Sequence, residues 1–389
     1  MHILVIPYTY KKKRTPHSGI FFREQALALK KSGNKVGILY LEIQSIRKLK
    51  NNYSKIFNQL IIEDDNGLIT FLWQGWNWFT QKYPLGRSII YVLKGYSLFK
   101  VYIKKYGKPD IIHAHSALNA GVLARKIKKK YDIPYVITEH RSVFALKDIK
   151  TSLLRLAGKV YSDADKRIIV SPKLGKLLEK KIGSEVKPWE WVPNLVNDIF
   201  FTKNSQKPND NFAIINIGYF NKNKGQKILL QAFKAVLRVR KNIELSLIGK
   251  GPLKNDLKEY SNNIGINQHV HFLGELDRIE VLKEIQKCDV LVVSSYYETF
   301  SVVIIEALAC GKPVIATKSG GPECIINNEN GILVEPGNPS ELKNAILDIS
   351  KNYSNYDLNM IRSSCYEKFS ESVVTKQLTD IYNQILINQ

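Results

Sequence analysis

Short apolar segments alternate with amphipathic segments along most of the chain. The first apolar run covers residues 2–7, and a helical pattern over residues 20–31 follows it, with Gly33 at the C-cap position. Unbroken apolar strands that alternate with helices are typical of a parallel sheet covered on both faces. The pattern therefore predicts an α/β fold. Further strands of the first half are expected at residues 36–41, 110–113, 134–138 and 167–170.

The alternation stops once and then restarts. Residues 202–211 are polar and turn-rich, which is typical of a linker. A chain of 389 residues is also too long for one ordinary core. We therefore predict two doubly wound domains facing a cleft, residues 1–195 and 196–370, and a C-terminal helix, residues 371–389, that packs back on the first. Beyond the linker the pattern predicts strands at 212–217, 243–248, 269–273, 289–294 and 313–317, and helical segments at 226–240 and 340–387.

One segment of the second half carries two carboxylates at a spacing that suits a ligand. Glu298 follows a predicted strand, and a helix that Thr299 or Ser301 caps is expected to contain Glu306. At a rise of ~1.5 Å per residue, the two Cα atoms lie on the order of 12 Å apart. That separation is too wide for a shared proton, but it allows the two carboxylates to bind hydroxyl groups at opposite ends of one extended ligand. The helix N-terminus between them offers backbone N–H groups to a phosphate.

This segment and its surroundings resemble the retaining glycosyltransferases of family 4, which have the GT-B fold and an E-x7-E motif. Glu298 and Glu306 match the motif, and residues 307–317, 320–323 and 331–334 match its usual context. The resemblance covers nearly the whole chain. It implies two Rossmann-like domains, of which the first binds the acceptor and the second binds a UDP- or GDP-sugar.

The resemblance also implies roles for individual residues of the second domain. Glu306 would hold the ribose hydroxyls of the nucleotide sugar, and Glu298 those of the transferred sugar. Gly218 begins a donor-binding loop, and Lys224 in that loop would neutralise the diphosphate as charge builds on the leaving group. Further donor contacts would come from backbone N–H groups and from the segment that reads the base: these are Phe300, Ser301, Val302 and Leu276.

Two residues of the first domain join this prediction. Gly19 lies where the glycine loop of such enzymes approaches the donor phosphates, and a plain turn glycine is the alternative. His140 ends a predicted strand and would contact the donor sugar near the reacting centre. Glu298, His140 and Lys224 are therefore the predicted catalytic residues. His113 and His115 flank another strand end and are interpreted either as structural residues or as residues that support the site from behind.

The sequence departs from the family pattern at Tyr219, where such enzymes usually have Arg. The departure removes one cation from the leaving-group clamp, and Lys222 either replaces it or is a solvated loop charge. No carboxylate can be named as a nucleophile, and the family is usually discussed in terms of front-face displacement, in which the leaving phosphate deprotonates the acceptor. No Asp-x-Asp motif stands in a suitable position, so we predict no metal and no cofactor besides the nucleotide-sugar co-substrate.

The positive charge of the chain is confined to one half. Lys and Arg number 58 and Asp and Glu 35, a net charge of +23. Residues 1–195 contain 36 basic and 14 acidic side chains, whereas the remainder contains 22 and 21. The basic half also holds Trp73, Trp76 and Trp78, ahead of a lysine-rich helix predicted over residues 87–106. Because Trp prefers the water–lipid interface and Lys binds anionic lipid, we predict that this half docks on an anionic membrane. The alternative is a solvated basic face with a tryptophan-rich core loop.

Other features indicate the compartment and the competing functions. The cysteines have no metal-ligand spacing and are interpreted as reduced thiols of a cytoplasmic protein. No apolar segment is long enough to span a bilayer, so contact with the inner face of the membrane would be peripheral. The predicted acceptor is a polyprenyl-diphosphate-linked glycan or a surface polysaccharide such as capsule, O-antigen or exopolysaccharide. A nucleotide-sugar epimerase of the same architecture usually lacks the E-x7-E context, and a basic nucleic-acid-binding protein would show a recognised module, which this sequence does not.

Overall fold

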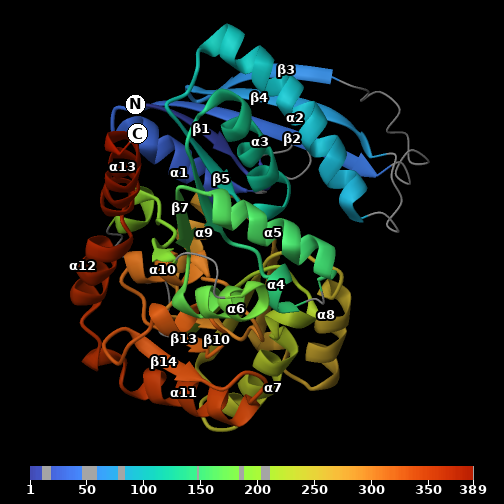
Figure 1. Cartoon of the computed structure of the whole chain (residues 1–389). Coiled ribbons are helices and arrows are strands. Elements are labelled where there is room, and N and C mark those ends of the chain that lie inside the picture. The colour runs from blue at the N-terminus through green and yellow to red at the C-terminus, as the bar shows by residue number, and fades with distance from the viewer. Residues whose placement is uncertain are drawn as a thin grey trace. The chain divides into compact units, whose positions relative to one another are not determined.

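The computed structural model of the chain forms two compact units. One consists of Met1–Pro193 with Val374–Gln389, and the other of Asn194–Val373. Figure 1 shows the ribbon coloured along the chain. Trp78 and most of the predicted linker lie outside the described residues. The structure describes residues 1–10, 19–45, 59–77, 84–146, 149–183, 188–202 and 211–388.

The first unit is built on an eight-stranded sheet with the order β3-β4-β2-β1-β5-β6-β7-β8. Neighbouring strands are parallel except β3 and β4, which form an antiparallel hairpin. The prediction of a wholly parallel sheet is therefore wrong at this edge. Asn66 and Gly67, at the turn of the hairpin, both have positive φ, as a tight hairpin turn requires. The strands are β1 (His2–Ile6), β2 (Lys35–Ser45), β3 (Gln59–Asp65), β4 (Leu68–Asn77), β5 (Ile111–His115), β6 (Tyr135–Glu139), β7 (Lys166–Ile169) and β8 (Glu190–Trp191).

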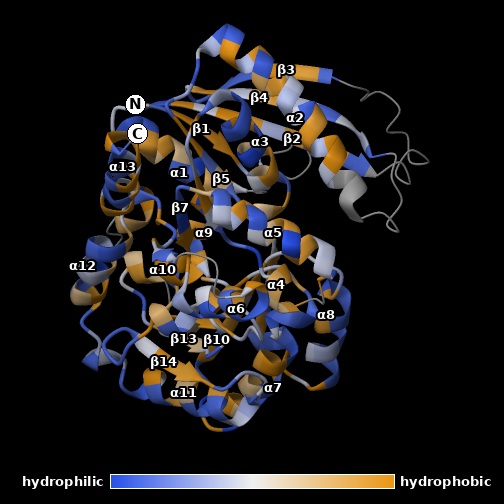
Figure 2. Cartoon of the chain, viewed as in Figure 1, coloured by the Kyte–Doolittle hydropathy of each residue, from blue (hydrophilic) through white to orange (hydrophobic). Residues whose placement is uncertain are grey.

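Helices connect these strands, and the longer ones mix apolar and polar positions. Figure 2 shows this mixture along α2, as expected of a helix with one buried face. The C-terminal helix α13 (Glu371–Ile387) supplies its later residues to this unit, where the Tyr382 hydroxyl lies 2.6 Å from Nδ1 of His113. The other helices are α1 (Ile20–Lys31), α2 (Pro84–Tyr106), η2 (Ala117–Gly121), α3 (Val122–Tyr131), α4 (Val143–Leu146), α5 (Thr151–Asp163) and α6 (Pro172–Ile182).

The tryptophan-rich segment is a strand and not a loop. Trp73 and Trp76 lie on β4 and are only 8% and 4% exposed, beside the fully buried Phe71. Residues this deeply buried do not reach a lipid surface. The predicted interfacial role is therefore wrong for these two tryptophans. No helix in the described ranges is both long and apolar enough to cross a bilayer.

The second unit contains a six-stranded, wholly parallel sheet with the order β11-β10-β9-β12-β13-β14. Numbered within the unit, this order is 3-2-1-4-5-6, the strand order of a Rossmann fold. Its direction of winding reverses between β9 and β12, where ligands bind in such sheets. The strands are β9 (Phe212–Ile217), β10 (Ile243–Ile248), β11 (Val270–Gly274), β12 (Val290–Val293), β13 (Val314–Thr317) and β14 (Gly331–Val334).

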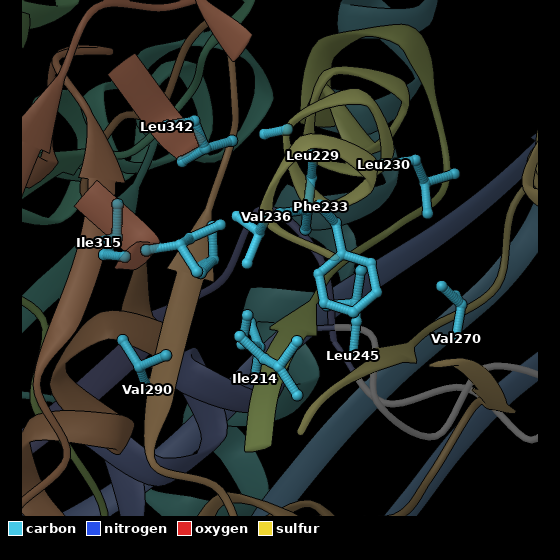
Figure 3. Close-up of a cluster of buried hydrophobic side chains, with 14 of the residues drawn as sticks. Ile214, Leu229, Leu230, Phe233, Val236, Leu245, Val270, Val290, Ile315 and Leu342 are labelled. Carbon is cyan, nitrogen blue, oxygen red and sulfur yellow. The ribbon is translucent and has the colours of Figure 1, made fainter. Parts of the chain in front are cut away.

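The core of this unit lies between the sheet and helices α7 and α11. Figure 3 shows Phe233 of α7 among the strand residues Ile214 and Leu245, all of them buried. The end of the chain, predicted as helical over residues 340–387, consists of three helices, which turns at Tyr353–Asn355 and Ser370 separate. The helices are α7 (Gln226–Leu237), α8 (Lys254–Asn263), α9 (Arg278–Lys287), α10 (Val302–Ala309), α11 (Pro339–Lys351) and α12 (Leu358–Phe369), with short turns η3 (Asp198–Phe201), η4 (Lys222–Lys224), η5 (Asn267–His269), η6 (Pro322–Cys324) and η7 (Tyr353–Asn355).

All four cysteines are free thiols, as the sequence analysis predicted. Burial raises the pKa of Cys288, Cys310 and Cys324 to about 12 each. Thiols with so high a pKa are poor nucleophiles at neutral pH. These cysteines are therefore packing residues.

Candidate functional site

Glu298 lies just beyond β12, at the point where the winding of the second sheet reverses. The residue is 9% exposed, and its carboxylate accepts hydrogen bonds from Ser295 Oγ (2.6 Å) and Lys224 Nζ (2.6 Å). Its backbone N–H donates to Ser319 (3.0 Å), and its carbonyl accepts from Gly321 (2.9 Å). A Cβ atom at Gly321 would lie 2.4 Å from Cα of Phe300, so only glycine allows this close approach. The carboxylate is thus held in place from both main chain and side chain.

Lys224 comes from the other side of the same reversal point. It ends η4, after β9, and Asn221 accepts a hydrogen bond from its N–H (3.1 Å) while its carbonyl accepts one from Ser294 Oγ (2.9 Å). The loop is therefore fixed at both backbone groups, and only the aliphatic chain is left to move. The structure brings together two predicted catalytic residues, Lys224 and Glu298, as an ion pair.

Glu306 has a separate cationic partner that the sequence analysis missed. The carboxylate is on α10, only 5% exposed, and accepts a hydrogen bond from Nη1 of Arg278. The Arg278 guanidinium also lies 4.6 Å from the ring centroid of Phe200. Arg278 is the first residue of α9, after the capping residue Asp277. A cation is disfavoured at a helix N-terminus, so an arginine at the first position of a helix is a sequence signal for a specific role of Arg278.

The N-terminus of α10 lies between the two carboxylates in the sequence. Ser301 occupies the N-cap position with φ 83° and ψ 79°, a left-handed conformation that is rare outside glycine. Its hydroxyl does not cap the helix, and its buried Oγ has no hydrogen-bond partner within the described part of the chain. The expected cap is therefore wrong for Ser301. The turn retains backbone strain at a place where the helix end favours an anion.

The other predicted donor residues lie near these ion pairs. Gly218 directly follows β9, and Leu276 is half-buried two residues before Arg278. Tyr219 is 51% exposed and brings no charge, and Lys222 is also exposed. Two cations therefore pair with the motif carboxylates in the structure: Lys224 with Glu298, and Arg278, not Lys222, with Glu306.

Gly19 of the first unit has a backbone reason to be glycine. It caps α1 with φ 71°, and a Cβ atom would lie 2.3 Å from the carbonyl oxygen of Thr9. The turn therefore requires glycine, whatever else the residue does.

His140 follows β6 and is half-buried at the end of a chain of imidazoles, of which His113 and His115 are fully buried. Its Nε2 lies 3.0 Å from Nδ1 of His115, and His113 Nε2 lies 2.7 Å from Thr138 Oγ1. Neither His115 Nε2 nor His140 Nδ1 has a hydrogen-bond partner among the described residues. The chain reaches from α13, through Tyr382, to the loop after β6.

Burial lowers the pKa of His113 and of His140 to about 3 and lowers that of His115 as well. The native imidazoles stay neutral at pH values where those of the unfolded chain, with a pKa of 6.5, take up protons. The stabilisation is therefore fully present above about pH 6.5 and is lost as the pH falls toward 3. We expect the free energy of unfolding to fall by up to about 1.4 kcal/mol per pH unit for each histidine.

Thermal unfolding between about pH 7 and pH 5 measures this loss. The variant His140→Gln removes one of the three groups and should show a shallower dependence of the melting temperature on pH. Equal slopes for parent and variant would contradict the burial argument.

Comparison with known proteins gives matches over most of the chain. Residues 75–199 match the family model described as Glycosyltransferase Family 4, and residues 198–364 match that described as Glycosyl transferases group 1. An uncharacterized glycosyltransferase of Methanocaldococcus jannaschii is 32% identical over 275 residues, which are 68% of this chain and 72% of that protein.

Two further matches extend over nearly the full length. A Bacillus subtilis protein named as a teichuronic acid biosynthesis glycosyltransferase is 23% identical over 365 residues, 89% of this chain and 88% of that protein. The crystal structure of Anabaena HepE in complex with UDP-glucose superposes with a TM-score of 0.73 at 18% identity, over 99% of this chain and all of that one. At this identity, the structural likeness bears on the fold.

Proposed function

This chain belongs to the family 4 glycosyltransferases (glycosyl transferases group 1), enzymes of the GT-B fold, and from that premise we propose that it is a retaining transferase that uses a UDP- or GDP-sugar. The observation that carries the proposal is the pair of ion pairs, Lys224–Glu298 and Arg278–Glu306, around the reversal point of a Rossmann-like sheet. The bound UDP-glucose of the Anabaena relative supports the donor class.

In the proposed site, Glu306 binds the ribose hydroxyls and Glu298 those of the transferred sugar. When the donor binds, Lys224 exchanges its ion pair with Glu298 for contact with the diphosphate and neutralises it. The backbone N–H groups of residues 300–302 also bind the diphosphate. Gly218 and Leu276 complete the donor contacts of the second unit. With a pKa of about 3, His140 acts as a neutral hydrogen-bonding group and not as a cation.

The proposed step breaks the bond between the anomeric carbon and the diphosphate oxygen and forms one to an acceptor hydroxyl on the same face. The leaving diphosphate takes the hydroxyl proton, so no separate base is required. The developing negative charge on the leaving group is stabilised by Lys224. A divalent metal has no part in the proposed step.

The anomeric configuration of the product tests this mechanism. Transfer or donor hydrolysis, followed by proton NMR in the presence of EDTA, should give the anomer of the donor at an undiminished rate. Inversion would contradict a retaining transferase, and loss of turnover in EDTA would contradict the metal-free step.

We further propose that the acceptor is a lipid-linked glycan or a surface polysaccharide, as the name of the Bacillus relative suggests. The exposed face of α2 supports contact with a membrane. It begins with Ile89 and Leu93, which are 50% and 55% exposed, and continues with the exposed Lys100 and Lys104. An apolar start and a basic end suit a helix lying against anionic lipid.

Flotation with liposomes measures this contact. The parent should float with vesicles that contain acidic lipid and remain in solution with neutral ones. The double change Ile89→Ser with Leu93→Ser should reduce recovery in the floating fraction, whereas changing the exposed Ile279 of the second unit to Ser should not. Equal recovery with both lipids would contradict membrane docking.

A further inference from the structure

A cavity of about 430 Å³ opens within the first unit, at the carboxyl ends of three neighbouring strands. Tyr8 follows β1, Ser116 follows β5, and Arg141 follows β6 after His140. β1 lies between β2 and β5, so the direction of winding reverses between β1 and β5, as it does between β9 and β12 in the second unit. Ligands bind at such points in open α/β sheets.

Arg141 is a half-buried cation that lines this cavity. Its guanidinium lies 4.3 Å from the ring centroid of Tyr8, and no carboxylate in the described part of the chain pairs with it. A guanidinium stacked on one face keeps its N–H groups at the edge, where they bind a planar or tetrahedral anion. The edge of the Arg141 guanidinium therefore suits a phosphate or carboxylate group.

The nearby carboxylate of Glu139 does not supply that anion. It is fully buried and accepts five hydrogen bonds, of which two come from the backbone N–H groups of His140 (3.1 Å) and Arg141 (3.0 Å). The others come from Ala117 N–H, Ser116 Oγ and Tyr161 Oη. Glu139 therefore fixes the backbone of the loops around the cavity, and its oxygens are already saturated.

The remaining walls of the cavity are apolar. Phe21 and Phe22 of α1 line one side, and Leu146 of α4 stands 48% exposed at the rim, as Tyr8 does at 39%. Exposed apolar side chains beside an unpaired guanidinium fit a ligand with an anionic group next to a sugar ring or a hydrocarbon chain.

We propose that this cavity is the acceptor subsite and that Arg141 binds a phosphate group of the acceptor. The inference rests on the proposed transferase function and names the acceptor as a phosphorylated molecule. The phosphate belongs either to a prenyl diphosphate carrier or to a soluble sugar phosphate, which share this chemistry.

Calorimetry with two probes, farnesyl diphosphate and glucose 6-phosphate, tests the inference. The measurements use the full chain with the change Lys224→Gln, so that the phosphate groups of the probes do not bind at the donor site. Adding Arg141→Gln should weaken binding by about 10- to 100-fold, and Arg141→Lys by less, because Lys keeps the charge but not the fork of N–H groups. Arg155→Gln, at an exposed position of α5, makes the same charge change and should leave binding as it was.

Each outcome decides the matter. Sensitivity to Arg141→Gln with farnesyl diphosphate supports a lipid carrier, and sensitivity with glucose 6-phosphate supports a soluble acceptor. If neither probe binds, or if Arg141→Gln and Arg155→Gln bind alike, the inference is overturned. Donor binding by the single variant Arg141→Gln, with Lys224 intact, separates the two proposals. If this variant binds nucleotide sugar, the transferase function stands even when the acceptor inference fails. If the parent protein binds no nucleotide sugar, both proposals are contradicted.

Discussion

Glu306→Gln is expected to weaken the affinity for the nucleotide sugar by at least about 100-fold, because the neutral amide no longer accepts charge-assisted hydrogen bonds from the ribose hydroxyls. The variant should also be less stable. Arg278 would keep a charge at a side chain only 20% exposed, with its partner carboxylate gone. Breaking a largely buried pair costs on the order of 3 kcal/mol. Calorimetry with UDP- and GDP-sugars and a thermal melt measure the two effects separately.

The double variant Glu306→Gln with Arg278→Gln provides the control. It removes both charges, so it should recover most of the lost melting temperature while donor binding stays absent. Recovery of both properties would mean that Glu306 acts only as the counter-ion of Arg278. Donor affinity equal to that of the parent in Glu306→Gln alone would place the ribose elsewhere.

Lys224→Gln is expected to lower kcat by about 100- to 1,000-fold, equivalent to about 2.7–4 kcal/mol of transition-state stabilisation. The reason is that Lys224 is the cation held beside Glu298, at 2.6 Å, where the leaving diphosphate is proposed to lie. Initial rates over a range of donor concentrations separate the effect on kcat from that on KM.

Lys222→Gln is the matched control, since it changes the same charge in the same loop at an exposed position. Its kcat should stay within about 3-fold of the parent, because exposed charges contribute little. An equal fall in both variants would mean that Lys222 supplies the cation missing at Tyr219, the alternative that the sequence left open.

Much of the fold follows from the periodicity of the sequence. The predicted helix at 20–31 and the strands at 212–217 and 243–248 match α1, β9 and β10 residue for residue. These segments are mainly apolar or regularly amphipathic and are followed by glycine or a polar residue, so local and tertiary preferences agree.

The hairpin of β3 and β4 was missed although the sequence contains a signal for it. Asn66-Gly67 is a favoured two-residue hairpin turn, and both residues have positive φ in the structure. The tryptophans of this segment were instead interpreted as residues of a membrane interface. Composition does not distinguish an interfacial tryptophan from a buried one, because the same apolar ring suits both places.

The sequence by itself determined the alternating α/β pattern, the division into two halves and the positions of Glu298, Glu306 and Lys224. Only the tertiary structure decided which side chains meet. Lys224 and Glu298 are 74 residues apart, Arg278 and Glu306 are 28 apart, and Tyr382 reaches His113 across 269 residues. The physical reason is that strand order sets which loops share an edge of a sheet. Spacing along the chain fixes neighbours within one helix or strand, but not between loops.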